Sequence, residues 1–262
     1  MKFSIVTPSY NYAQYLPTAI ESVLAEQESG IELEHIVVDA ASTDGTVKVL
    51  ERYPHLKWIS EPDEGMSDGI NKGFRKAQGD LIMWLNADDA LIPGALGKVQ
   101  DYAEKNPDAD LIYGDCVFTD ADLKPTRQKY EHEFDPFVLR WGGCYIPSTS
   151  CYYRRKIIDA GELIDVRYKV CMDFEYYMRL HHLGYKFGYM PEPLAYFRWH
   201  EVNTSSVYSE RRLDERREIQ RHFLKERGLS FLGATPILKA MVYASQAKRV
   251  TRKKIERLTG RR

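Results

Sequence analysis

The sequence lacks the patterns that mark disulfide-stapled, zinc-stapled or membrane-spanning chains. Its four cysteines, Cys116, Cys144, Cys151 and Cys171, show no CxxC spacing and no accompanying histidine tract. This argues against a disulfide framework or a structural zinc site and favours a reducing compartment. No run of 18 apolar residues occurs, and the opening MKFSIVTPSYNY has no sustained apolar stretch. We therefore expect a cytoplasmic protein without a membrane span or signal peptide.

Positive charge is scarce in most of the chain and concentrated near its end. The net charge is −1, but residues 211–262 carry 16 Lys and Arg against 5 Asp and Glu. Residues 229–247 contain one charge, Lys239, and are interrupted by Gly233 and Pro236, whereas 248–262 hold eight basic residues and one acidic residue. We expect 229–262 to contact an anionic membrane surface, which would make the protein peripheral on the inner face of the membrane. The alternative is a packed terminal helix with a disordered basic end; no nucleic-acid partner is expected.

The first 115 residues alternate strand-like and helix-like patterns. This alternation predicts an α/β fold with a mainly parallel sheet flanked by helices. The expected strands are 2–7, 33–39, 56–60, 80–85 and 110–113, and the expected helices are 14–27, 44–53, 67–77 and 93–105. Further along, we expect helices at 173–183 and 210–227 and short strands at 185–190 and 194–199.

Polar and acidic residues follow four of the expected strands, where ligands of such sheets bind. They are Thr7-Pro8-Ser9-Tyr10, Asp39-Ala40-Ala41-Ser42, Glu61-Pro62-Asp63 and Asn86-Ala87-Asp88-Asp89. Neither GxGxxG nor GxxxxGK[ST] occurs, so a glycine-rich phosphate cradle is excluded. Because Asp88 and Asp89 end a buried strand, a divalent metal that bridges carboxylates and a diphosphate would balance their charge. The alternative for this acidic pair is a helix cap ahead of Pro93.

Taken together and in order, these segments resemble family 2 glycosyltransferases of the GT-A fold. The likeness covers residues 2–205 and rests on TPSYN, VVDAASTDGT, SEPDEGMSDGINKGFRKAQGD, WLNADD and CMDFEYYMRLHHLGYKFGYMPEPLAYFRWHEVNTS. It implies transfer of a sugar, with inversion and usually with Mn²⁺ or Mg²⁺, from a nucleoside-diphosphate-sugar. UDP is our first guess for the nucleotide. The acceptor would be a glycan or lipid-linked hydroxyl in cell-surface polysaccharide biosynthesis. The likeness divides the chain into a donor-binding half (1–115), an acceptor-binding half (116–205) and a basic helical C-terminal extension (206–262).

Two positions depart from the family pattern. The acidic DxD motif stands here as Asn86-Ala87-Asp88, and an amide hydrogen-bonds a ribose but is a poorer metal ligand. Processive members of the family carry QxxRW, whereas Ala195 stands here in the place of Gln, ahead of Arg198-Trp199. The resemblance therefore implies a non-processive enzyme with Asp88 as the chief metal ligand.

The resemblance and the spacing of the residues assign roles within the site. The expected donor-binding residues are Thr7, Pro8, Tyr10, Asp39, Ser42, Asp68, Asn71, Lys72, Asn86, Ala87 and Asp88. The expected metal ligands are Asp88, Asp89 and His200, and the expected acceptor-binding residues are Glu175, Arg198 and Trp199. The family places its general base at Asp173, where a helix N-terminus would keep the carboxylate ionised with a low pKa.

Each assignment has a structural alternative. Asp39 can cap the following turn, Asp68 and Lys72 can form a surface pair, Asp173 can be a helix N-cap, and His200 can be structural. Two other function classes also stay open. A sugar nucleotidyltransferase normally has a glycine-rich basic loop after the first strand, which is missing here. A non-catalytic nucleotide- or glycan-binding protein of the same fold would more readily have lost Asp88 or Asp173.

Overall fold

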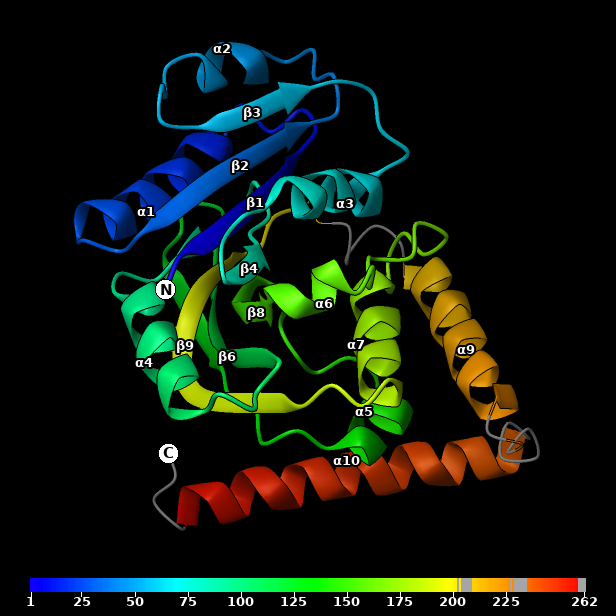
Figure 1. The fold of residues 1–262 in the computed structure, drawn as a ribbon. Helices are drawn as coiled ribbons and strands as arrows, with labels where there is room; N and C mark the ends of the chain where they lie inside the picture. Colours follow the sequence, from blue (N-terminus) through cyan, green and yellow to red (C-terminus); the bar gives the residue numbers. More distant parts are fainter. Residues whose placement is uncertain (202, 204–208, 227, 229–234, 259–262) are drawn as a thin grey trace.

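The computed structural model describes residues 1–201, 203, 209–226, 228 and 235–258 (Figure 1). Strands of this part of the chain form one nine-stranded sheet in the order β3-β2-β1-β4-β8-β6-β9-β5, with β7 paired to β6. Helices flank the sheet, as the α/β prediction requires. Within the described ranges, no helix combines the length and the apolar character that a membrane crossing needs.

The first part of the chain is the parallel half of the sheet. Its elements are β1 (Phe3–Ser9), α1 (Leu16–Glu28), β2 (Leu33–Asp39), α2 (Thr46–Leu50), β3 (Lys57–Ser60), α3 (Met66–Lys76) and β4 (Leu81–Trp84). β1 pairs in parallel with β2 and β4, and β2 with β3. The element types predicted from the periodicity are confirmed here, and β2 has the predicted bounds.

The second part of the sheet is mixed. Its elements are β5 (Ala90–Leu91), α4 (Ala95–Lys105), β6 (Leu111–Thr119), β7 (Pro125–Lys129), α5 (Pro136–Gly142), β8 (Cys151–Arg154), α6 (Arg155–Asp159), α7 (Met172–His182) and β9 (Phe187–Arg198). β8 lies antiparallel between β4 and β6, whereas β9 runs parallel to β6. The prediction of two short strands at 185–190 and 194–199 is wrong, because β9 is one strand. It includes Pro191 and Pro193, and its pairing with β6 shifts register beside them.

The two faces of the sheet bury different side chains. Val6 and Phe74 belong to one hydrophobic cluster, with residues of α7 and of a later helix, α9 (Ser209–Glu226). Ile5 and Val99 belong to the other cluster, with residues of α1 and α4. Because neighbouring residues of β1 point to opposite faces, this strand is covered on both sides. The polar end of β1 is therefore held rigidly between two packed layers.

Two helices close the described chain, α9 (Ser209–Glu226) and α10 (Thr235–Leu258). Figure 1 shows α9 beside α7 and α10 running across α5. The expected interruption at Pro236 is wrong, because this residue lies in the first turn of α10; Gly233 is outside the described residues. Lys248 pairs with Asp135 at 2.7 Å, so the described part of the basic tail packs on the body. Residues 259–262, at the expected disordered end, are outside the described part.

Candidate active site

Two adjoining cavities open at the carboxyl ends of the parallel strands. The outer cavity, of about 600 Å³, is lined by residues that include Pro8, Tyr10, Ala40, Pro62, Asp63 and Arg211. The inner cavity, of about 120 Å³, is lined by residues that include Asn86, Ala87, Asp88, Met172, Asp173 and Asn203. Both walls contain Pro8, Tyr12, Met66, Lys169 and Val170. The two cavities therefore form one cleft with a wide and a narrow end.

The carboxylate of Asp88 lies in the turn after β4, at the narrow end of the cleft. Its Oδ2 is 2.9 Å from His200 Nε2 and accepts a 3.4 Å hydrogen bond from Asn203 Nδ2. His200 is held in place by stacking on the ring of Tyr15, with centroids 4.8 Å apart, and its backbone N–H donates to Asn203 Oδ1. The structure thus brings together Asp88 and His200, which lie 112 residues apart in the sequence.

The neighbouring Asp89 points into the protein. One carboxylate oxygen accepts the backbone N–H of Arg198 at 3.0 Å, and the other accepts Asn86 Nδ2 at 2.9 Å. Burial and then the negative charge of Asp88 raise the pKa of Asp89 well above its usual range. Arg198 donates from Nε to the carbonyl of Asp88 at 2.7 Å and covers the ring of Tyr15. Asp89 and Arg198 therefore support the turn that presents Asp88.

The donor atoms around Asp88 suit a hard divalent cation. Asp88 Oδ2 and His200 Nε2 are spaced like neighbouring ligands of one ion, and the buried Oδ1 of Asn86 has no hydrogen-bond partner. In the described part of the chain, no group of three or more His, Cys, Asp or Glu side chains is arranged to hold a metal. One or two protein ligands are typical of Mg²⁺ sites that are completed by water and substrate phosphates.

Asp173 lies on the wall of the inner cavity, together with Asp88. It is the second residue of α7, whose N-cap is Cys171 without a side-chain capping bond, so the N-cap alternative for Asp173 is wrong. The carboxylate accepts the backbone N–H of Phe174 at 2.7 Å. The expected low pKa is also wrong, because burial raises the pKa of Asp173 more than the hydrogen bonds from Phe174 and Cys144 lower it.

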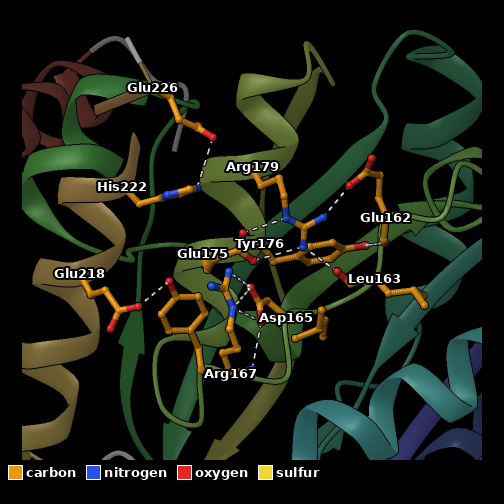
Figure 2. A network of polar contacts seen from close by, with 12 residues as sticks. Glu162, Leu163, Asp165, Arg167, Glu175, Tyr176, Arg179, Glu218, His222 and Glu226 are labelled. Carbon is orange, nitrogen blue, oxygen red and sulfur yellow. Dashed lines mark hydrogen bonds and ion pairs between the residues drawn. The ribbon is translucent and has the colours of Figure 1, made fainter. Parts of the chain in front are cut away.

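Glu175, two residues further along α7, is not among the residues that line the two cavities. Its Oε1 accepts from Arg179 Nε at 2.8 Å, and Arg179 also pairs with Glu162 at 2.5 Å and donates to the Leu163 carbonyl. Figure 2 shows the guanidinium of Arg179 between Glu162 and Glu175. The network joins α7 to the loop that precedes it, and Glu175 is only 6% exposed. The structure therefore places Glu175 in a structural network, and its expected acceptor role stays a prediction.

The residues expected to hold the nucleotide divide into two groups. Pro8 and Tyr10 line the outer cavity, and Tyr10 is 60% exposed. Thr7 is buried, with its hydroxyl 2.9 Å from His35 Nε2. Asp39 is buried, and its carboxylate accepts hydrogen bonds from Ser42 and, at 2.6 Å, from Ser60. The bonds from Ser42 match the turn-capping alternative, the bond from Ser60 comes from β3, and the next residue, Ala40, lines the outer cavity.

The expected cluster on α3 lies outside the walls of both cavities. Lys72 pairs with Glu61 at 2.9 Å and with Asp68 at 3.6 Å. Asn71 is buried and exchanges two hydrogen bonds with the backbone of Ile164, at 2.8 and 2.9 Å. This arrangement matches the surface-pair alternative for Asp68 and Lys72, while Asn71 ties α3 to the loop before α7.

Two basic residues that the sequence reasoning missed face the cleft, Lys169 and Arg211. Of the described residues, Lys169 is the one basic side chain that lines both cavities. Its Nζ donates to the carbonyl of Glu64, and a Cβ on Gly65, which has a φ of +114°, would lie 3.3 Å from that Nζ. Burial, and then the charges of Asp88 and Asp89, raise the pKa of Tyr12 in the same cleft. A lone lysine in a loop gives no sequence signal for this position.

Trp199 lies on the outer surface beyond Arg198. It is 49% exposed and packs against Phe118 and Phe197, with ring centroids 6.3 Å away in each case. Exposed aromatic rings of this kind offer a flat apolar face and are enriched where proteins bind ligands. The expected acceptor role of Trp199 stays a prediction.

Comparisons with known proteins show the family of this chain. The family described as glycosyl transferase family 2 matches residues 4–161. A protein of Nostoc sp., named an uncharacterized glycosyltransferase, is 30% identical over 217 residues, which are 78% of this chain and 66% of that protein. A PGL/p-HBAD biosynthesis glycosyltransferase of Mycobacterium tuberculosis is 28% identical over 183 residues, 68% of each chain.

Solved structures share the fold at low sequence identity. S. aureus TarS 1–349 in complex with UDP-GlcNAc superposes with a TM-score of 0.66 at 15% identity, over 96% of this chain and 89% of that one. The mannosyltransferase PcManGT from Pyrobaculum calidifontis, in complex with GDP-Man and Mn²⁺, gives a TM-score of 0.58 at 16% identity, over 95% and 75%. At these identities the likeness establishes the architecture of the chain, and the ligands named belong to those proteins.

Proposed function

The chain belongs to glycosyl transferase family 2, and we propose that it moves a sugar from a nucleoside-diphosphate-sugar to a hydroxyl of a glycan or lipid-linked acceptor. The observation that carries the proposal is the shared wall of the inner cavity, on which Asp88 and Asp173 both lie. The outer cavity adjoins it and has room for a nucleotide. A donor bound along the cleft would place its diphosphate where the outer and inner cavities meet.

The donor is held, in this proposal, by groups along the cleft. The nucleoside occupies the outer cavity against Pro8, Tyr10 and Asp63. The diphosphate lies beside Lys169, whose ammonium exchanges the Glu64 carbonyl for phosphate oxygens. UDP remains our first choice of nucleotide, supported by the UDP-GlcNAc complex of TarS, which shares the fold.

Asp88 and His200 are the residues that would hold Mn²⁺ or Mg²⁺, with Asn86 Oδ1 as an additional donor. When bound there, the ion supplies positive charge against the leaving nucleoside diphosphate. The complex of PcManGT with GDP-Man and Mn²⁺ supports this choice of ion. Asp89 is left out of the ligand set, because both of its oxygens accept hydrogen bonds from the protein.

Asp173 acts as the general base. The acceptor oxygen forms a bond to the anomeric carbon as the bond from that carbon to the diphosphate oxygen breaks, so the configuration inverts. The electron pair leaves with the diphosphate, and the hydroxyl proton moves to the Asp173 carboxylate. A raised pKa makes Asp173 a stronger base than an ordinary aspartate. Ala195 at the position of the processive motif's Gln supports a single transfer per encounter.

Nucleotide binding tests the proposal most directly. Calorimetry with UDP, GDP and dTDP should show binding that requires Mn²⁺ or Mg²⁺, and Asp88→Asn should abolish it while the protein stays folded. Thermal shifts with a panel of nucleotide sugars would then identify the donor. Equal affinity for the nucleotide in EDTA, or an Asp88→Asn variant that binds like the wild type, would contradict the metal assignment.

Attachment to an anionic membrane surface stays a separate prediction. Pairs with Glu131 and Asp135 already engage Lys248, Arg249 and other basic residues of α10, so fewer charges face outward than the sequence indicates. Tyr243 and Val250 are 72% and 68% exposed on the same helix. Co-sedimentation with anionic vesicles at low salt tests the prediction, and a protein that stays in the supernatant contradicts it.

A further inference from the structure

Helix α9 lines the outer cavity with Arg211 and bonds the segment before α7 through a buried acidic residue, Glu215. Glu215 accepts hydrogen bonds from three consecutive backbone N–H groups, those of Lys169, Val170 and Cys171, at 3.0, 2.9 and 2.9 Å. These three N–H groups lie at and just before the N-cap of α7, which is Cys171. The backbone N–H groups at the start of a helix have no partner within the helix, and the Cys171 side chain makes no capping bond. Glu215 therefore satisfies donors that the local sequence does not.

The bonds to Glu215 are of the strong, charge-assisted kind. Glu215 is 7% exposed, and Arg211, which lines the outer cavity, donates to its Oε1 at 2.7 Å. Burial alone would raise the pKa of Glu215, but the N–H groups of the segment and the Arg211 guanidinium lower it below its usual range. An ionised carboxylate at this place also interacts favourably with the N-terminal end of α7.

The segment that Glu215 holds, residues 169–171, includes Lys169 and ends two residues before Asp173, the two groups that the proposed reaction uses. Lys169 lines both cavities, and Asp173 follows two residues after Cys171 on the wall of the inner one. On its other side, the segment is fixed by Ser67 of α3, which donates to the carbonyl of Tyr168 at 3.1 Å. Without Glu215, three backbone donors would lose their partner on the α9 side.

We propose that Glu215 is a positioning residue that sets Lys169 against the donor diphosphate and Asp173 against the acceptor hydroxyl. This inference rests on the proposed glycosyl transfer for the roles of Lys169 and Asp173. It makes α9 a working part of the active site, although Glu215 lies 44 to 46 residues beyond the segment in the sequence. A misplacement of about 1 Å at a reacting group is enough to lower a rate about 10²-fold.

The test compares Glu215→Gln with Glu218→Gln in the full chain. Both remove one negative charge from the same helix, but Glu218 bonds the Tyr168 hydroxyl, at 3.3 Å, and not the backbone of the segment, and a glutamine oxygen retains this interaction (Figure 2). In Glu215→Gln we expect faster amide exchange at 169–171, kcat about 10- to 100-fold lower, and weaker UDP binding. Glu218→Gln should stay within about twofold of the wild type in all three measurements.

Every outcome decides the matter. Unchanged amide exchange in Glu215→Gln overturns the positioning of the segment, and faster exchange with unchanged kcat overturns its role in turnover. All three measurements are made well below the melting temperature and expressed per folded molecule, so that a loss of folded protein is not counted as a loss of kcat. If Glu215→Gln does not fold, Glu215→Asp keeps the charge but shortens the side chain, and the same three changes should appear in weaker form. Absence of transfer by the wild type would refute the proposed function, whereas amide exchange tests the segment without it.

Discussion

The two C-terminal helices dock on the same body by opposite chemistry. Helix α9 inserts the acidic Glu215 beneath the segment before α7 and buries Ile219 and Phe223 in the core. Helix α10 instead brings basic residues to two buried carboxylates, Glu131 and Asp135, at the connection that leads into α5. The difference teaches that an extension with a large net positive charge need not have a single role. One helix reaches the cleft, while the other stabilises the scaffold away from it.

Asp173→Asn should have the largest effect on activity, because Asp173 lies in the cleft next to the segment that α9 holds. We expect kcat to fall at least about 10²- to 10⁴-fold, because the base is lost. The melting temperature at neutral pH should stay the same or rise. A carboxylate whose folded pKa is raised destabilises the fold once it ionises, and asparagine removes that charge. Turnover and thermal melting on this one variant are sufficient, and an active Asp173→Asn enzyme rejects the base assignment.

The pH profile sharpens the same assignment. Because the base has to be ionised, kcat should fall as the pH drops through the raised pKa of Asp173. The acid limb should therefore lie above the usual aspartate pKa of about 3.9. An acid limb at or below that value would contradict the burial argument. Tm should be recorded over the same pH range, so that unfolding is not mistaken for titration.

Lys169→Met should weaken UDP binding by about tenfold or more, since charged hydrogen bonds contribute about 1.5–3 kcal/mol. Lys72→Met is the matched control, because Lys72 pairs with Glu61 and Asp68 outside both cavities. Its effect should remain below about threefold. Isothermal calorimetry on both variants decides which lysine meets the diphosphate, and the reverse order of effects would restore the sequence-based expectation for Lys72.

Glu175→Gln should change stability and leave turnover nearly intact. The substitution breaks a buried pair with Arg179, and we expect the free energy of unfolding to fall by about 1–3 kcal/mol. Urea denaturation measures that loss, and kinetics with varied acceptor measures KM. An increase in acceptor KM without loss of stability would support the acceptor role that the sequence predicted.

Glu131→Gln should have the smallest effect on activity and a moderate effect on stability. Glu131 is fully buried and meets Lys129, Arg249 and Lys253, so its loss should lower the free energy of unfolding by about 1–2 kcal/mol without changing kcat. Lys248→Gln, at an exposed partner of Asp135, should lower it by less than about 1 kcal/mol, and by less again in high salt. A loss of kcat in either variant would break the distinction between the two helices.

The sequence predicted the parallel half of the fold well because its signals are local. The apolar runs of β1, β2 and β4 and the periodicity of α1 and α3 each lie within a few residues. The strand ends that this half presents also led to Asp88. In the second half, β9 continues past two prolines because its pairing with β6 shifts register, and no local pattern encodes a partner strand.

The candidate site was predictable only where the adjacent residues in the sequence indicate the role of a residue. Asp173 and Asp88 stand in recognisable motifs, and the structure brings both to one cavity. The raised pKa of Asp173 comes from burial by distant elements, which the sequence cannot supply. Lys169 and Glu215 have no motif at all. Their relation arises from the docking of α9, and only the folded chain reveals it.

The bond between Asp89 and the backbone of Arg198 has a consequence for synthesis. The two residues lie 109 positions apart, and the short strand β5 likewise cannot pair until its partner β9 has been synthesised. At about 5–20 residues per second, a ribosome needs roughly 5–20 s to deliver β9 after Asp89 has been made. During that interval Asp89 can accept the local hydrogen bond from Asn86, but the backbone N–H of Arg198 that closes the turn has not yet been made. The emerging chain therefore completes the turn that presents Asp88 only after β9 has been made.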